Sequence, residues 1–249
     1  MKRFLKLYYL PLATIAGGLL AMLFRALMWI GSVGDENSVL LVTGGFADVM
    51  SWILSAAMII FLFLATWRLQ GGNKYRWNFP PSVFAAAGML VAAITFVISS
   101  VNELQANVDA ITKASAIVGF FAAAALALLA FGRFKGYHFS VLFHGVICVY
   151  LMLYLISHYR LWSSFPQLQS YAFELLAVVF LTLACYHRAA FDADNGKRRP
   201  YAFSSMAALF FCIAALPGCD NVIFLLGCAL WMLATPCKLS AVRNHPKEE

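Results

Sequence analysis

Charged side chains are scarce in this sequence: 12% of its 249 residues are charged, whereas 63% are hydrophobic. Soluble domains carry about 25% charged residues, so the composition excludes an ordinary soluble protein. Several catalytic signatures are missing too, among them HExxH, GxSxG, a glycine-rich phosphate loop and an aspartate cluster for a metal–diphosphate. The six cysteines show no CxxC spacing, and we interpret them as small apolar membrane residues. The sequence predicts no cofactor and no metal site.

Long hydrophobic runs dominate what is present. Six runs approach or exceed the roughly 20 residues that cross a bilayer, and two shorter ones lie together near the end. The predicted spans are 8–31, 45–67, 82–101, 114–131, 138–156, 168–186, 201–216 and 222–236. We interpret the first run as an uncleaved span, because it is too long for a signal peptide and no A-x-A-like site follows it.

The predicted fold is an all-α polytopic transmembrane helix bundle of eight spans, forming a single integral membrane domain over 1–249. Seven spans are expected instead if the short last hairpin is re-entrant or interfacial. Segments 61–68 (FLFLATWR) and 180–188 (FLTLACYHR) resemble each other, and each is followed by a basic turn and a proline. This similarity raises the hypothesis of two parallel four-helix repeats, 1–136 and 137–249.

Basic residues indicate the orientation of the spans. With an internal N-terminus, 15 of the 18 Lys and Arg residues fall on the cytoplasmic side, as the positive-inside rule expects. We therefore predict a cell (cytoplasmic) membrane location with both termini cytoplasmic. The basic residues lie in short loops between apolar spans, which argues against nucleic-acid binding. Lys197, Arg198 and Arg199 are expected to face anionic lipid, with a protein partner as an alternative. Asp192 and Asp194 in the same loop are interpreted as a solvated turn.

Three charges inside predicted spans form the candidate site. Arg25 and Glu174 each lie about 9 Å inside the outer end of their span, and Asp48 lies within a turn of its own span end. Because all three are expected at a similar depth in the outer leaflet, an Arg25–Glu174 or Arg25–Asp48 pair is feasible beneath polar loops expected to form a rim. The predicted ligand-binding residues are Arg25, Asp48, Glu103, His158, Arg160, Gln167, Gln169 and Glu174. The alternative is a static ion pair that locks the helices together under ordinary solvated loops.

Histidines suggest a second alternative, which the sequence favours less. His144 and His187 lie toward the cytoplasmic ends of neighbouring predicted spans and could in principle ligate one haem or metal. Only His144 is well inside a span, and His187 beside Arg188 is more simply an interfacial residue.

A resemblance to other proteins rests on two segments of the second half, SHYRLWSSFPQLQSYAFELLA and CYHRAAFDADNGKRRPYAF. They resemble a pattern in uncharacterised multi-span membrane proteins of clostridial-type bacteria. The resemblance implies a bacterial cytoplasmic membrane and implies no activity, cofactor or site.

Three functions remain open at this point. The first is a transporter-like or small-ligand-binding protein with an outward-facing polar pocket. The second is a non-catalytic sensor or an assembly subunit of a larger complex. The third is an intramembrane enzyme that acts on a lipid-linked substrate through Glu174 and His158 as an acid–base couple.

Overall fold

The computed structural model describes residues 2–32, 45–67, 69, 75–106, 109–137, 139–163 and 168–235. All regular structure in these ranges is helical. The helices are α1 (Lys2–Ser32), α2 (Phe46–Trp67), α3 (Tyr75–Asn78), α4 (Val83–Ala106), α5 (Ala110–Lys135), α6 (Val141–Trp162), α7 (Leu168–Asp192), α8 (Arg198–Ala214) and α9 (Val222–Ala234). The predicted all-α class is confirmed for the described part of the chain.

Six helices are long and apolar enough to cross a membrane: α1, α2, α4, α5, α6 and α7. Large apolar side chains cover their outer faces; Phe46 and Leu142, for example, are each 76% exposed. Such exposure is costly in water and favourable in lipid, so the chain is a multi-pass membrane protein. Helices α8 and α9 are shorter, with 17 and 13 residues.

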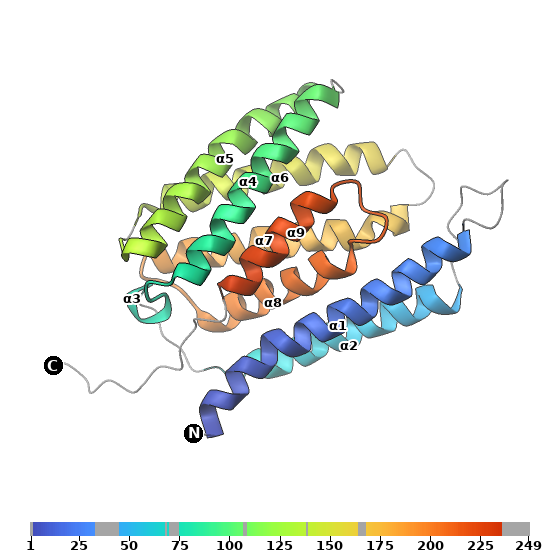
Figure 1. The fold of residues 1–249 in the computed structure, drawn as a ribbon, viewed down its shortest axis with the longest axis horizontal. Coiled ribbons are helices and arrows are strands. Elements are labelled where there is room, and N and C mark those ends of the chain that lie inside the picture. The colour runs from blue at the N-terminus through green and yellow to red at the C-terminus, as the bar shows by residue number, and fades with distance from the viewer. Residues whose placement is uncertain are drawn as a thin grey trace.

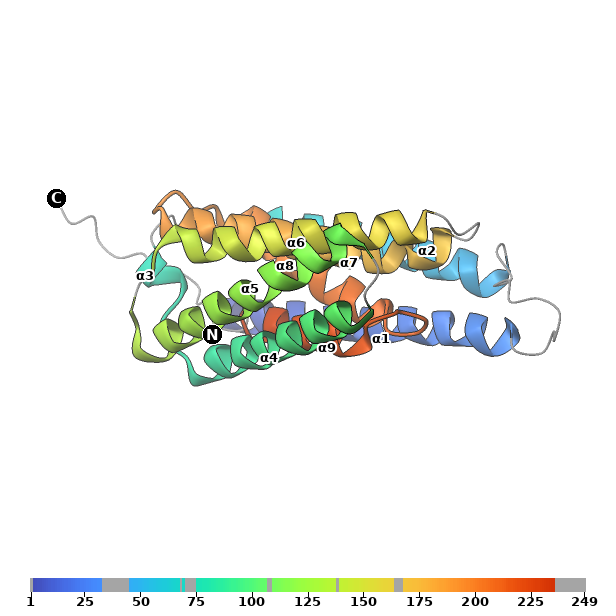
Figure 2. The same ribbon diagram turned by 90° about the horizontal axis from the view of Figure 1, so that it is seen from above.

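Helix α8 lies at the centre of the bundle. It packs against α1, α2, α7 and α9, and most of its side chains are buried on every face. Figure 1 shows the α1–α2 pair along one side of α8 and the α4–α5 pair on the far side, and Figure 2 shows α4 and α9 running together. We call the end of the bundle that carries α3 the α3 end, and the other the opposite end.

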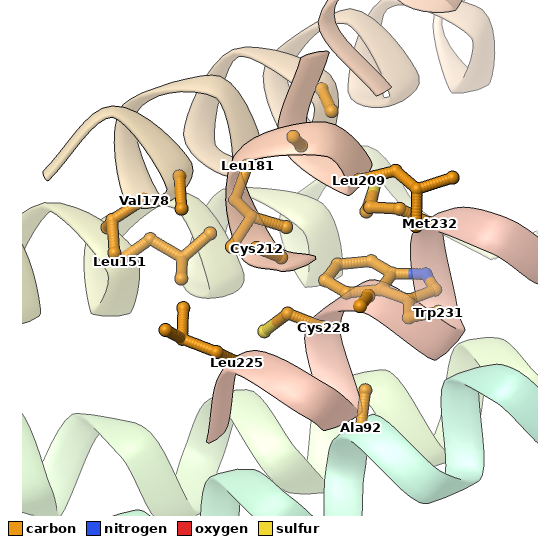
Figure 3. Packing of buried hydrophobic residues seen from close by; sticks show 14 of the residues in the cluster. Ala92, Leu151, Val178, Leu181, Leu209, Cys212, Leu225, Cys228, Trp231 and Met232 are labelled. Carbon is orange, nitrogen blue, oxygen red and sulfur yellow. The ribbon is translucent and has the colours of Figure 1, made fainter. Parts of the chain in front are cut away.

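The apolar core fills the space between α4, α6, α7, α8 and α9. Figure 3 shows Leu151, Leu181, Cys212 and Leu225 meeting from four of these helices, with Trp231 beside them. Helices α4 and α9 approach closely, because α9 presents Gly227 to the side chain of Thr95. Small residues permit such close contact between membrane helices, where lipid supplies no hydrophobic drive for their association.

Replacing Gly227 with alanine tests this close approach. The added methyl would lie 2.1 Å from Thr95 Oγ1 and 2.8 Å from Thr95 Cβ, so α4 and α9 must separate or Thr95 must rotate. Such overpacking costs about 1–3 kcal/mol, measured as lost stability on denaturation in detergent. Gly145→Ala in α6 is the matched control, because nothing lies within 4 Å of its added methyl. Equal stability of the two variants would contradict the packing.

Helix boundaries differ from the predicted spans at several polar ends. Glu103 was expected in a loop, yet it lies in the last turn of α4; His158 and Arg160 were also expected in a loop, yet they lie in α6. Helix α7 continues to Asp192. These expectations were wrong because hydropathy falls at polar residues, whereas helices of a bundle continue wherever neighbouring helices supply polar partners.

The two predicted repeat halves differ in their helices. The first half ends in α4 and α5 with 24 and 26 residues, whereas the second ends in α8 and α9 with 17 and 13. Helix α7 packs along α8, while α2 packs against α1 and α8. The repeat therefore stays a prediction.

Candidate functional site

Arg25 of α1 is brought to the two carboxylates with which the sequence paired it. Its side chain is 7% exposed, and both Asp48 of α2 and Glu174 of α7 are close enough to attract it electrostatically. The guanidinium carbon lies 4.3 Å from the ring centroid of Phe173. Nη2 donates to the backbone carbonyl of Pro217, at 3.5 Å. Three buried charges from three helices thus converge at the opposite end.

The turn between α8 and α9 takes part in this convergence. Pro217 follows the C-terminus of α8, where the helix dipole is negative, so a cation such as Arg25 is favoured there. The backbone N–H of Asp220 donates to the carboxylate of Glu174. Arg25 and Glu174 therefore provide hydrogen-bond partners for backbone groups of the α8–α9 turn, which lie beyond the helix ends and have no partner within a helix.

Glu174 also meets an aromatic stack on α6. Its side chain is 2% exposed, and Oε1 accepts a hydrogen bond from the hydroxyl of Tyr154 at 3.4 Å. Tyr154 is fully buried and stacks between His158, at 3.9 Å between ring centroids, and Phe224 of α9, at 4.6 Å. Oε2 of Glu174 has no hydrogen-bond partner within the described part of the chain. That oxygen can accept a hydrogen bond from a further group.

His158 is held by its own helix. Nδ1 lies 3.0 Å from the backbone carbonyl of Tyr154 and 3.2 Å from Ser157 Oγ. A carbonyl accepts only, so Nδ1 carries the proton and Nε2 is the basic nitrogen. Tyr154 contacts both residues, because its ring stacks on His158 while its hydroxyl binds Glu174.

A second buried carboxylate, Glu103, lies where α4 meets α5. It is 7% exposed and faces the hydroxyls of Ser99 and Ser115. Neither carboxylate oxygen makes a well-aligned hydrogen bond to any residue that the structure describes. The hydroxyl oxygen of Ser99 accepts a hydrogen bond from Asn221 Nδ2, at 2.7 Å. Asn221 thereby ties this group to the same α8–α9 turn that holds Arg25 and Glu174.

Tyr150 connects the two carboxylates. Its hydroxyl faces Ser99 and Ser100 near Glu103, and its ring lies 6.2 Å from that of Tyr154, which binds Glu174. We call Arg25, Asp48, Glu103, Tyr150, Tyr154, His158, Glu174 and Asn221 the polar layer. Its residues come from α1, α2, α4, α6, α7 and the α8–α9 turn.

The remaining predicted site residues are Arg160, Gln167 and Gln169. Arg160 is exposed and forms an ion pair with Asp109 at 3.5 Å, a type that contributes little stability. Gln167 lies outside the described residues, and Gln169 belongs to the first turn of α7. The structure therefore places Glu103 and His158 in the wall of the site rather than in a loop rim.

Sequence reasoning missed Tyr150, Tyr154 and Asn221. Tyrosine is common in membrane helices near the interface, so neither tyrosine was distinctive. A signal did exist in the pair Ser99–Ser100 inside an apolar run and in Asp220–Asn221 within a two-helix turn. Paired polar residues at matching depths indicate a shared interhelical contact.

His144 and Asp192 also correct the sequence interpretation. Asp192 was expected in a solvated turn, yet its side chain is 3% exposed and its Oδ2 lies 2.6 Å from His144 Nδ1. His187 is partly exposed, beside Tyr186. Within the described ranges, no three His, Cys, Asp or Glu side chains gather as metal ligands.

The comparisons with known proteins add no assignment. No known protein family, curated protein or solved structure matches this chain.

Proposed function

We propose that this chain is a transporter-like, small-solute-binding protein of a bacterial cytoplasmic membrane. In this proposal it has eight spans, both termini are cytoplasmic and the polar layer lies toward the outer face. The observation that carries it is the convergence of Arg25, Asp48 and Glu174 beneath Tyr154. Ionisable residues within membrane helices are expensive and typically line substrate or ion pathways.

The chemistry of the layer suits a polar solute. Arg25 offers a cation, Glu174 Oε2 and the carboxylate of Glu103 offer acceptors, and Tyr154 and Phe173 offer aromatic faces. A few directed polar groups within an apolar wall are typical of small-molecule sites.

Native mass spectrometry of the gently purified protein tests the proposal. We expect a co-purified small molecule on the wild type and on Asp109→Asn, which removes an exposed carboxylate from the same end. Glu174→Gln should lose it, because an amide changes both the charge and the acceptor beside Arg25. Folded but bare protein in all three samples would refute the proposed site.

The other two functions have less support. Of the three basic residues expected to contact a partner, Arg198 is 8% exposed and donates through Nε to Asn78 Oδ1, which leaves Lys197 and Arg199 exposed. For the enzyme, the contacts of Glu174 and His158 lead to Tyr154, which binds the one and stacks on the other.

A further inference from the structure

A second group of buried charges lies at the α3 end. Arg133 of α5 and Arg188 of α7 both lie over the ring of Phe79, with guanidinium carbons 5.1 Å and 3.5 Å from its centroid. They are 2% and 5% exposed. Phe79 packs edge-on against Phe191 and Tyr201. We call Arg133, Arg188 and these three aromatic residues, together with Tyr75, the arginine cluster.

Positive charge exceeds negative charge around the cluster. Arg133 and Arg188 are close enough to repel each other, and the buried Arg198 lies nearby, on Asn78 beside Phe79. Asp192 interacts with Arg188 but is also paired with His144.

The other carboxylates of the described chain do not change this balance. Asp194 is exposed, and its Oδ1 accepts from the backbone N–H of Tyr75 at 3.5 Å. The rest lie at the opposite end: Asp48, Glu103, Asp109, Glu174 and Asp220. Asp192 is thus the carboxylate beside Arg188, whereas no carboxylate of the described chain acts on Arg133. A buried charge without a counter-charge is costly, so an anion beside Arg133 would be favourable.

Several N–H groups of Arg133 and Arg188 within the arginine cluster make no well-aligned hydrogen bond in the described part of the chain. Arg133 Nη1 donates to the carbonyl of Pro80 at 2.8 Å, and Arg188 Nη2 donates to the hydroxyl of Tyr75 at 3.5 Å. Arg133 also faces the hydroxyl of Tyr75, and Arg188 faces that of Tyr201. Arg133 Nε, Arg133 Nη2 and Arg188 Nε are nevertheless buried and make no well-aligned hydrogen bond to the residues described. Cation–π contact with Phe79 offsets part of the cost of burial but satisfies none of these N–H groups.

We propose that the arginine cluster binds a phosphate group, supplied either by a phospholipid headgroup or by a solute. Paired guanidiniums match the oxygens of phosphate in a planar, forked geometry. Arg133 lies near the end of α5, and Arg188 lies one turn from the end of α7. This is the depth of a headgroup, and basic sites between membrane helices bind anionic headgroups. The site is separate from the polar layer, so the two proposals stand or fall independently.

Two arms of one thermal-unfolding experiment distinguish the sources of the phosphate. Protein purified in phosphate-free buffer is titrated with inorganic phosphate at constant ionic strength, and separately with phosphatidic acid in detergent, with phosphatidylcholine as the lipid control. We expect Tm to rise by about 5–10 °C at a hundredfold excess over Kd in at least one arm. A rise with phosphatidic acid alone identifies a lipid, and a rise with inorganic phosphate identifies a solute.

Variants locate the site. Arg133→Gln and Arg188→Gln should each raise the Kd at least tenfold, and Arg133→Lys should raise it as well, because lysine keeps the charge but loses the fork. Arg199→Gln should leave the Kd for inorganic phosphate unchanged, since this exposed arginine of the same end donates to the carbonyl of Leu69. No rise of the wild-type Tm in either arm, or equal Kd values for Arg188→Gln and Arg199→Gln, would overturn the proposal. The wild-type arms decide even if the glutamine variants fail to fold.

Discussion

Asp192→Ala is expected to lower the free energy of unfolding by about 3–5 kcal/mol, because it removes a counter-charge of the buried Arg188 and the partner of the buried His144. The Oδ2 atom of Asp192 lies 2.6 Å from Nδ1 of His144, and both side chains are almost fully buried. The substitution removes the carboxylate that contacts His144 of α6, and it also removes a counter-charge of Arg188. Unfolding of the purified protein by titration with denaturing detergent in mixed micelles measures the loss.

Asp194→Asn provides the control for this variant. Asp194 lies two residues further along, is exposed and has a φ of 53°, a left-handed conformation that asparagine tolerates. A change within about 0.5 kcal/mol is expected, as for most surface substitutions. If Asp192→Ala cost no more than Asp194→Asn, the His144–Asp192 pair would not join α6 to α7.

Arg25→Leu is the second substitution with a large expected effect, again about 3–5 kcal/mol. It leaves Asp48 and Glu174 without their cation and the carbonyl of Pro217 without a donor. The leucine keeps an apolar contact with Phe173, so most of the loss should be electrostatic. The same mixed-micelle titration measures it.

The double variant Arg25→Leu/Glu174→Gln separates the pair from its surroundings. Because neutral glutamine does not need the cation, the double variant should recover at least about 1 kcal/mol relative to the sum of the two single effects. Strict additivity would mean that Arg25 and Glu174 do not interact, and it would remove the electrostatic basis of the polar layer.

Much of the fold could be predicted because lipid imposes few options. A bilayer admits only helices or closed barrels, so each apolar run of sufficient length had to be a helix. The convergence of Arg25 and Glu174 was predictable for a related reason, because opposite charges at a similar depth within a membrane bundle usually pair with each other. Depth along a span can be counted in residues.

The rest of the site depends on what lies across from a residue, which hydropathy does not encode. Tyr154 is one of ten tyrosines, and only the packing of α6 against α7 gives it Glu174 as a partner. Arg133 and Arg188 follow the positive-inside rule like any loop residue. That rule counts charge by side and does not distinguish a buried arginine from a solvated one.

The lengths of α8 and α9 have a consequence for the surrounding lipid. At about 1.5 Å per residue, the 13 residues of α9 rise about 20 Å, whereas the hydrocarbon core of a bilayer is about 30 Å thick. Because Val222 and Ile223 at the start of α9 are exposed, we expect a bilayer that contacts them to thin locally. A thicker membrane would draw Asp220 and Asn221 toward hydrocarbon and strain the hairpin that holds Arg25. We therefore expect the stability of the α8–α9 hairpin to depend on the thickness of the membrane.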